Sequence, residues 1–201
     1  MSLKLETIPL FPLGTTLLPY GRMPLQIFER RYIDLIAQCM REGTGFGVVQ
    51  LRRGSEVGQG GIDAPDIAAV GCFARIVDWD QLPNQLLGIT IEGGERLAIE
   101  RCWRADSGLV MADAEVGALP EPEPVASRWL GLAQVLEGLH LHPHVQRLGY
   151  VETNDNAWAM GWQLAQLLPL LEALKYQLLV APTLEDLLSP LDQTITQMSG
   201  E

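Results

Sequence analysis

The stretch TIPLFPLGTTLLPYGRMPLQIFERRY, from Thr7 to Tyr32, decides the fold that we predict for this chain. It holds two short apolar segments, Thr7–Phe11 and Met23–Phe28, and prolines interrupt both. Such segments are typical of strands at sheet edges and of irregular turns. From Glu29 to Glu42 the apolar residues recur at helical intervals, and Gly43 is suited to ending a helix. The stretch therefore predicts two strands followed by a helix.

Strand signals continue to about Val116. The expected strands are Phe46–Leu51, Ile67–Trp79, Leu86–Glu92, Glu95–Trp103 and Leu109–Val116, with a long surface loop over 52–66 and a tight reversal at Gly93-Gly94. Several short strands separated by regular turn signals are typical of a closed or nearly closed β-barrel. We therefore expect a barrel subdomain with one helix over residues 1–116.

The second part of the chain is predicted to be helical. Residues 117–124, GALPEPEP, form a proline-rich joint that should be extended and fairly stiff. The expected helical segments after it are Val125–Leu141, Asn156–Leu168, Pro169 to about Val180, and Leu184–Leu188 with Thr183 as its cap. Short helices of this kind pack as a bundle. The predicted fold class is α+β, with a helical bundle subdomain over 125–201.

Composition restricts the class of protein. An apolar fraction of 47% and a charged fraction of 19% are typical of a folded chain. The net charge is −11, and residues 113–201 hold 3 basic against 12 acidic side chains, which argues against a nucleic-acid partner. There is no bilayer-length apolar run and no export leader, so we expect a cytoplasmic protein without a membrane partner. The three scattered cysteines, Cys39, Cys72 and Cys102, are expected to be reduced.

A series of short motifs runs through both parts of the chain in a characteristic order. The motifs are Pro9–Leu13, Leu18-Pro19, Pro24-Leu25, Ile27–Tyr32, Phe46–Val49, Val70–Ile76, Gly94–Ile99, Leu167–Leu170 and Leu184–Leu188. Their order resembles the amino-terminal domain of the Lon protease family. The resemblance covers about residues 6–190, although Cys72 stands where the family usually has threonine and Leu97 where it has phenylalanine.

This resemblance implies a PUA-like β pseudo-barrel followed by a helical subdomain. It also implies a substrate-recognition module that binds unfolded polypeptides or a protein partner, in regulated proteolysis or quality control, with self-association left open. Two alternatives remain. One is a small-ligand or modified-residue sensor, as the related domain of cereblon allows, and the other is RNA binding, which the negative charge disfavours.

No catalytic machinery is expected. The chain contains no G-x-x-x-x-G-K-[ST] segment to cradle the phosphates of ATP. Its two lysines, Lys4 and Lys175, lie in no context that resembles the serine–lysine site of Lon. We therefore expect a non-enzymatic protein with no catalytic residue and no cofactor.

The candidate residues for binding a client come from two sources. Glu29, Arg31, Tyr32 and Arg96 belong to the family signature. Trp79 and Trp103 lie near strand ends, where a partly exposed aromatic ring can anchor a protein contact. Structural roles are the simpler interpretation for the first four: Glu29 would start the helix, an arginine would tie the helix to the barrel, and Tyr32 would be core. Packing is the simpler role for the tryptophans at helical spacing, which are Trp129, Trp158 and Trp162.

Two further clusters contain residue types that can carry chemistry. His140, His142 and His144 alternate in HLHPH and could ligate a metal from an extended segment, but Pro143 and the lack of a fourth ligand disfavour a metal site. Asp78 and Asp80 could act as a general acid–base pair. They are expected instead to share the solvent face of a strand that leads into a turn.

Overall fold

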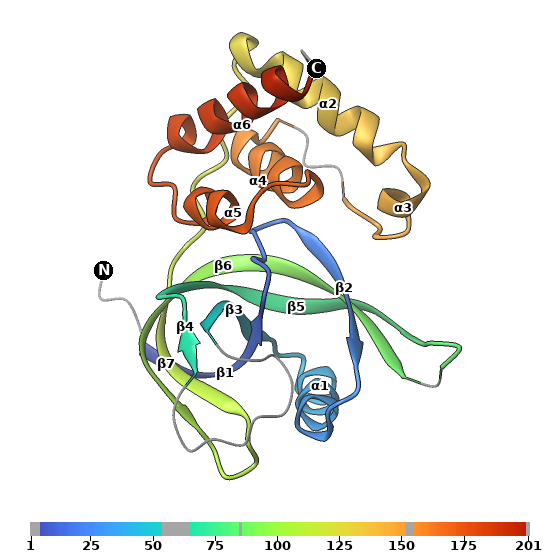
Figure 1. Cartoon of the computed structure of the whole chain (residues 1–201), viewed down its shortest axis with the longest axis vertical. Helices are drawn as coiled ribbons and strands as arrows, with labels where there is room; N and C mark the ends of the chain where they lie inside the picture. The colour runs from blue at the N-terminus through green and yellow to red at the C-terminus, as the bar shows by residue number, and fades with distance from the viewer. Residues whose placement is uncertain (1–4, 54–64, 85, 152–154, 200–201) are drawn as a thin grey trace. The chain divides into compact units, whose positions relative to one another are not determined.

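The computed structural model describes residues 5–53, 65–84, 86–151 and 155–199 (Figure 1). The chain forms two compact units. The first comprises Met1–Leu17 and Met23–Leu119, and the second comprises Leu18–Arg22 and Pro120–Glu201. The segment Leu18–Arg22 thus belongs with the helices, although it lies between two strands in the sequence. The predicted α+β class, with the strands before the helices, is confirmed.

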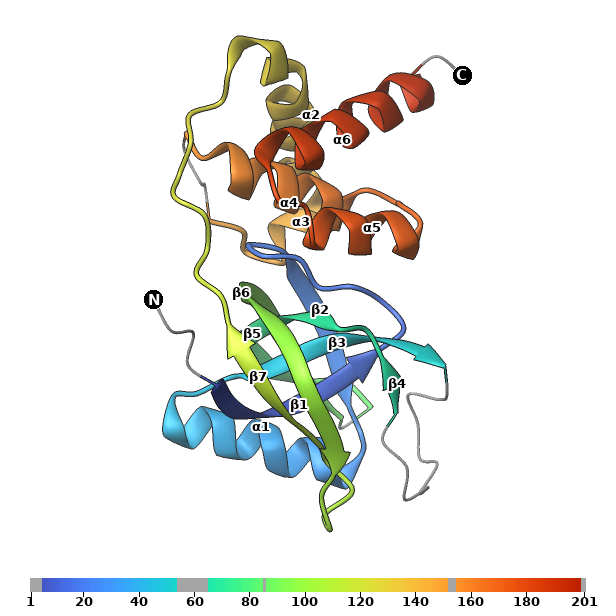
Figure 2. The ribbon, with the colours of Figure 1, turned by 90° about the vertical axis from the view of Figure 1, so that its left-hand side faces the viewer.

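Five strands of the first unit pair in a closed ring (Figures 1 and 2). They are β1 (Leu5–Leu13), β7 (Val110–Val116), β6 (Leu87–Arg104), β5 (Val70–Gln81) and β3 (Phe46–Arg53), in that order around the ring. Neighbours are antiparallel, except that β1 and β3 pair in parallel and close the barrel. Two short strands attach outside the ring: β2 (Arg22–Ile27) pairs with β6, and β4 (Asp66–Ile67) pairs with β3.

The predicted reversal at Gly93-Gly94 is wrong. Strand β6 runs through both glycines as one strand of 18 residues. Cys72 pairs with Arg96 but Ala74 pairs with Gly93, so β6 contains one residue more than β5 over this step, and a Cβ at Gly94 would lie 2.3 Å from Nη1 of Arg75. The glycines therefore mark a bulge and a close approach between strands, which is the other common reason for glycine within a strand.

The other strand predictions differ in their bounds. The expected strand Ile67–Trp79 is broken between Ile67 and Val70, so that it becomes the short β4 and the long β5. Most of the predicted surface loop, residues 54–64, lies outside the described residues.

Helix α1 (Arg30–Glu42) packs through its buried residues Tyr32, Leu35, Ile36 and Cys39. Tyr32 stacks on Phe11 of β1 with ring centroids 3.9 Å apart, which fixes the start of the helix against the barrel. Gly43 ends the helix as predicted, with a left-handed φ of 64°, and its N–H donates to the Cys39 carbonyl. Met40 of the same helix is 43% exposed.

The helical unit is built around α4 (Ala157–Leu167), which contacts three other helices (Figure 2). These are α2 (Leu130–His140), α5 (Glu172–Leu179) and α6 (Leu184–Ser199), while α3 (Pro143–Gln146) contacts α2. Trp158 and Trp162 of α4 are buried, and so is Trp129, which confirms their packing role. The indole N–H of Trp162 donates to the Leu178 carbonyl at 3.1 Å and ties α4 to α5.

Three helix bounds differ from prediction. A short 3-10 turn, Ser127–Trp129, precedes α2, and α5 begins at Glu172 rather than Pro169. Helix α6 continues well past Leu188 to Ser199, with Pro190 inside it. Thr183 does cap α6, because its hydroxyl accepts the Asp186 N–H at 3.2 Å.

Within the described ranges, no helix is long and apolar enough to cross a membrane.

Candidate functional site

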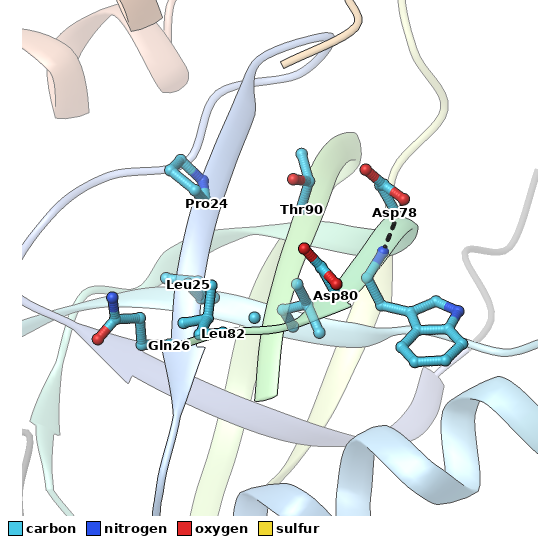
Figure 3. A pocket seen from close by; sticks show the side chains of 10 residues that line it. Pro24, Leu25, Gln26, Asp78, Asp80, Leu82 and Thr90 are labelled. Carbon is cyan, nitrogen blue, oxygen red and sulfur yellow. Dashed lines mark hydrogen bonds between the residues drawn. The ribbon is translucent and has the colours of Figure 1, made fainter. Parts of the chain in front are cut away.

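A groove opens on the first unit where the end of β5, the start of β6 and strand β2 lie side by side (Figure 3). Its volume is about 260 Å³. We call it the β2–β5–β6 groove. Its lining residues are Pro24, Leu25 and Gln26 of β2, Asp78, Trp79 and Asp80 of β5, Leu82 of the following turn, and Gly88, Ile89 and Thr90 of β6.

Strand register places the polar rim of this groove. Asp78 pairs with Thr90 and Asp80 pairs with Gly88, so these four residues share one face of the β5–β6 ladder. Gly88 has no side chain, and Leu82 packs over it: a Cβ at Gly88 would lie 3.0 Å from Leu82 Cδ2. The groove therefore has an apolar floor with two carboxylates on its rim (Figure 3).

Trp79 is the aromatic residue of the groove lining. It is 58% exposed, and its backbone N–H donates to Asp78 Oδ1 at 2.9 Å. It also lines a second hollow of about 500 Å³, formed with the end of α1 and with β5. Met40 and Val77, which line that hollow, are 43% and 40% exposed. Trp79 thus contributes an uncovered aromatic surface to two adjoining hollows, which is typical of a surface that binds another molecule.

The negative charges of the two groove carboxylates are not neutralised by a partner cation among the described residues. Asp78 and Asp80 are exposed at the end of β5, as the simpler interpretation of this pair predicted. Neither forms an ion pair with a cation among the residues that the structure describes. Arg75, which lies on the same strand, pairs instead with Glu95 at 3.0 Å and covers the Phe73 ring. The groove consequently presents net negative charge beside apolar surface.

The signature residues at the start of α1 form a separate cluster. Glu29 and Arg31 pair at 2.8 Å, and both side chains are mostly buried. Arg31 also donates to the Gly108 carbonyl at 2.9 Å and lies over the Tyr32 ring. This arrangement ties α1 to the turn between β6 and β7, which supports a structural role for these three residues. None of them lines the groove.

The remaining two candidates lie on β6, away from the groove lining. Trp103 is half-buried, and the guanidinium of Arg101 lies 4.9 Å from its ring centroid. Arg96 pairs in register with Cys72, and its carbonyl accepts the Gly117 N–H. Of the six predicted residues, only Trp79 lines the groove. The β2 residues were missed, because only the pairing of β2 with β6 brings them beside β5. Leu82 follows β5 directly in the sequence, but no local pattern marks it as part of a groove.

The HLHPH segment does not present its histidines together on an extended strand. Pro143 begins α3, and His142 caps that helix by accepting the His144 N–H on Nδ1 at 3.3 Å. His140 stacks instead on Tyr150 with ring centroids 5.4 Å apart. Across the described ranges, no group of three histidine, cysteine or acidic side chains is placed to hold a metal.

The fold and the groove together define an α+β protein in which a small β-barrel carries an open groove and a helical unit follows it. The chain belongs to the family of the ATP-dependent protease La (LON) substrate-binding domain, whose family model matches residues 7–195. The resemblance seen in the sequence is thereby confirmed.

Two solved structures are similar to this chain. A Lon N-terminal domain protein from Xanthomonas campestris is 31% identical, with a TM-score of 0.68, over 95% of this chain and 98% of the other. The N-terminal domain of the Mycobacterium avium complex Lon protease is 18% identical, with a TM-score of 0.54, over 94% and 97% of the two chains, and this likeness supports the fold alone. No curated protein matches the chain.

Proposed function

We propose that this chain is a non-catalytic recognition module that binds unfolded polypeptide segments in the β2–β5–β6 groove. The observation that carries the proposal is Trp79, an indole 58% exposed beside an apolar groove. Membership of the substrate-binding family supports the same class of ligand. An exposed, rigid aromatic ring at an apolar groove is the usual anchor of a protein contact.

The groove is suited to a single side chain of an extended client. Pro24, Leu25 and Leu82 offer aliphatic contacts, and burying one large apolar side chain contributes about 1.5–3 kcal/mol. Ordering a flexible client opposes this gain. One module should therefore bind weakly, and a client with several apolar segments should bind better. The open groove favours an extended chain over an enclosed small ligand.

The proposal excludes proteolysis by this chain itself. The sequence has no phosphate-cradling loop, and the family match is to a substrate-binding domain. We propose that the chain delivers or retains clients for another component of regulated proteolysis in the cytoplasm. The three cysteines are free, as is usual in that compartment.

The test is a titration of a fluorescently labelled, permanently unfolded polypeptide, followed by anisotropy at two ionic strengths. We expect saturable binding that persists at the higher salt. Trp79→Ala should weaken it roughly tenfold or more, as for other aromatic anchors. The matched control is Trp103→Ala, because that ring lies outside the groove, and it should bind like the parent. Equal binding by the Trp79→Ala variant would refute the groove as the site.

A further inference from the structure

We propose that the β2–β5–β6 groove selects polypeptide segments in which basic residues at alternate positions accompany an apolar residue. Asp78 and Asp80 would hold the basic side chains, and the floor at Leu82 and Gly88 would take the apolar one. This inference rests on the proposed function and specifies its class of client.

Charge complementarity is the first argument. Both carboxylates are exposed, and neither pairs with a cation in the described part of the chain. The other rim residues, Gln26 and Thr90, are uncharged, and Arg75 is already paired with Glu95. A client that brings a lysine or an arginine would therefore complete ion pairs that the fold leaves open. The net charge of −11 would also speed the approach of such a client.

Spacing is the second argument. Asp78 and Asp80 lie two residues apart on one face of β5, a separation of roughly 7 Å at the rise of a strand. An extended client repeats its side chains on one face at this same interval. Two basic residues separated by one residue can thus face both carboxylates at once. Leu82 follows in the turn after β5 and lines the same groove, so the apolar side chain of the client would lie next to the basic pair.

Repulsion of acidic clients is the third argument. A client with acidic side chains at these positions would bring like charges against Asp78 and Asp80, which is unfavourable. The groove therefore favours basic over acidic segments.

The experiment compares three short fluorescent peptides that share one leucine and differ at two alternate positions, which hold lysine, glutamine or glutamate. Each is titrated with the parent protein, with the double variant Asp78→Asn and Asp80→Asn, and with the double variant Glu100→Gln and Asp106→Asn. The last pair removes the same charge from exposed residues outside the groove. Asparagine at position 78 keeps an oxygen to accept the Trp79 N–H.

For the parent protein we expect the lysine peptide to bind most tightly and the glutamate peptide most weakly. Two exposed ion pairs should separate the lysine and glutamine peptides roughly two- to thirtyfold. The groove double variant should bind both peptides equally, and the control double variant should keep the parent's ranking. If the parent binds all three peptides alike, the basic preference is refuted while the proposed function stands. If it binds none of them, nor the unfolded polypeptide, both are refuted.

Discussion

The backbone N–H of Trp79 donates to the carboxylate of its neighbour Asp78, at 2.9 Å. The chain thus satisfies this backbone group locally, near the end of β5, and leaves the indole itself 58% exposed. An exposed polar strand end would be ordinary, but an exposed indole loses the hydrophobic stabilisation that burial would provide. The arrangement is understandable if the ring is covered by a client when the protein binds one.

The first prediction concerns tryptophan fluorescence. Trp129, Trp158 and Trp162 are buried and Trp103 is half-buried, so quenching by the neutral quencher acrylamide in the native protein should come mainly from Trp79. Trp79→Phe should remove most of that quenching, whereas Trp103→Phe should remove little. A saturating unfolded polypeptide should protect the parent from acrylamide. Equal quenching with and without the polypeptide would contradict the position of the ring in the interface.

The second prediction concerns Arg31. Its side chain is mostly buried, pairs with Glu29 and donates to the Gly108 carbonyl, so Arg31→Ala should lower the free energy of unfolding by about 1–3 kcal/mol. The neighbouring Arg30 pairs with Asp34 in an exposed position. Arg30→Ala should therefore change the free energy of unfolding by less than about 1 kcal/mol. Denaturant titrations measure both. A loss of client binding by folded Arg31→Ala protein would instead show that the signature cluster binds the client directly.

The third prediction contrasts two glycines. A Cβ at Gly71 would lie 2.6 Å from the Val48 carbonyl oxygen, within the backbone contact of β5 and β3, so Gly71→Ala should destabilise the fold by about 1–3 kcal/mol or more. A Cβ at Gly138 in α2 would meet nothing within 4 Å. Gly138→Ala should therefore stabilise the helix by about 0.5–1 kcal/mol. In thermal unfolding, Gly71→Ala should lower the melting temperature and Gly138→Ala should raise it. A change in the same direction for both variants would contradict this packing.

The fourth prediction concerns Asp113 and pH. Hydrogen bonds from the Thr7 hydroxyl and from Arg101 hold the pKa of the Asp113 carboxyl below its ordinary value. A lowered pKa in the folded state means that the carboxylate contributes stability at neutral pH, and this contribution is lost as the pH falls through the folded pKa. Asp113→Asn should therefore unfold more easily than the parent at neutral pH, with the difference shrinking below about pH 4. Thr7→Val removes one of the two hydrogen bonds, so the stability contributed by Asp113 should be lost at a higher pH than in the parent. If Asp113→Asn remained less stable than the parent by the same amount in acid, the contribution of the Asp113 carboxylate would be contradicted.

Much of the fold could be predicted from local patterns. The helix α1, its glycine cap and the series of strands follow from spacing and turn residues, which act between neighbours in the sequence. The error at Gly93-Gly94 has a physical reason: glycine serves both tight turns and bulges, and only the pairing of Gly93 with Ala74 decides between them. The length of α6 was missed because Pro190 normally disfavours a helix interior.

The site was less predictable than the fold. Trp79 could be proposed because an aromatic residue near a strand end is often exposed. Pro24 and Leu25 could not, because they come near Asp78 and Asp80 only through the pairing of β2 with β6, which are far apart in the sequence. Glu29 and Arg31 stand out in the sequence as signature residues, and their mostly buried ion pair at the start of α1 supports a structural role rather than a place in the groove.

The most direct test of the account is residue-resolved NMR of the labelled protein during titration with an unfolded polypeptide. We predict that backbone signals shift progressively and saturate over Pro24–Gln26, Asp78–Leu82 and Gly88–Thr90, the segments that form the β2–β5–β6 groove. Signals around Arg31, Gly108 and Trp103 should change little. Saturable shifts confined to those latter residues, or no shifts at all at saturating polypeptide, would contradict the claim that this groove binds clients.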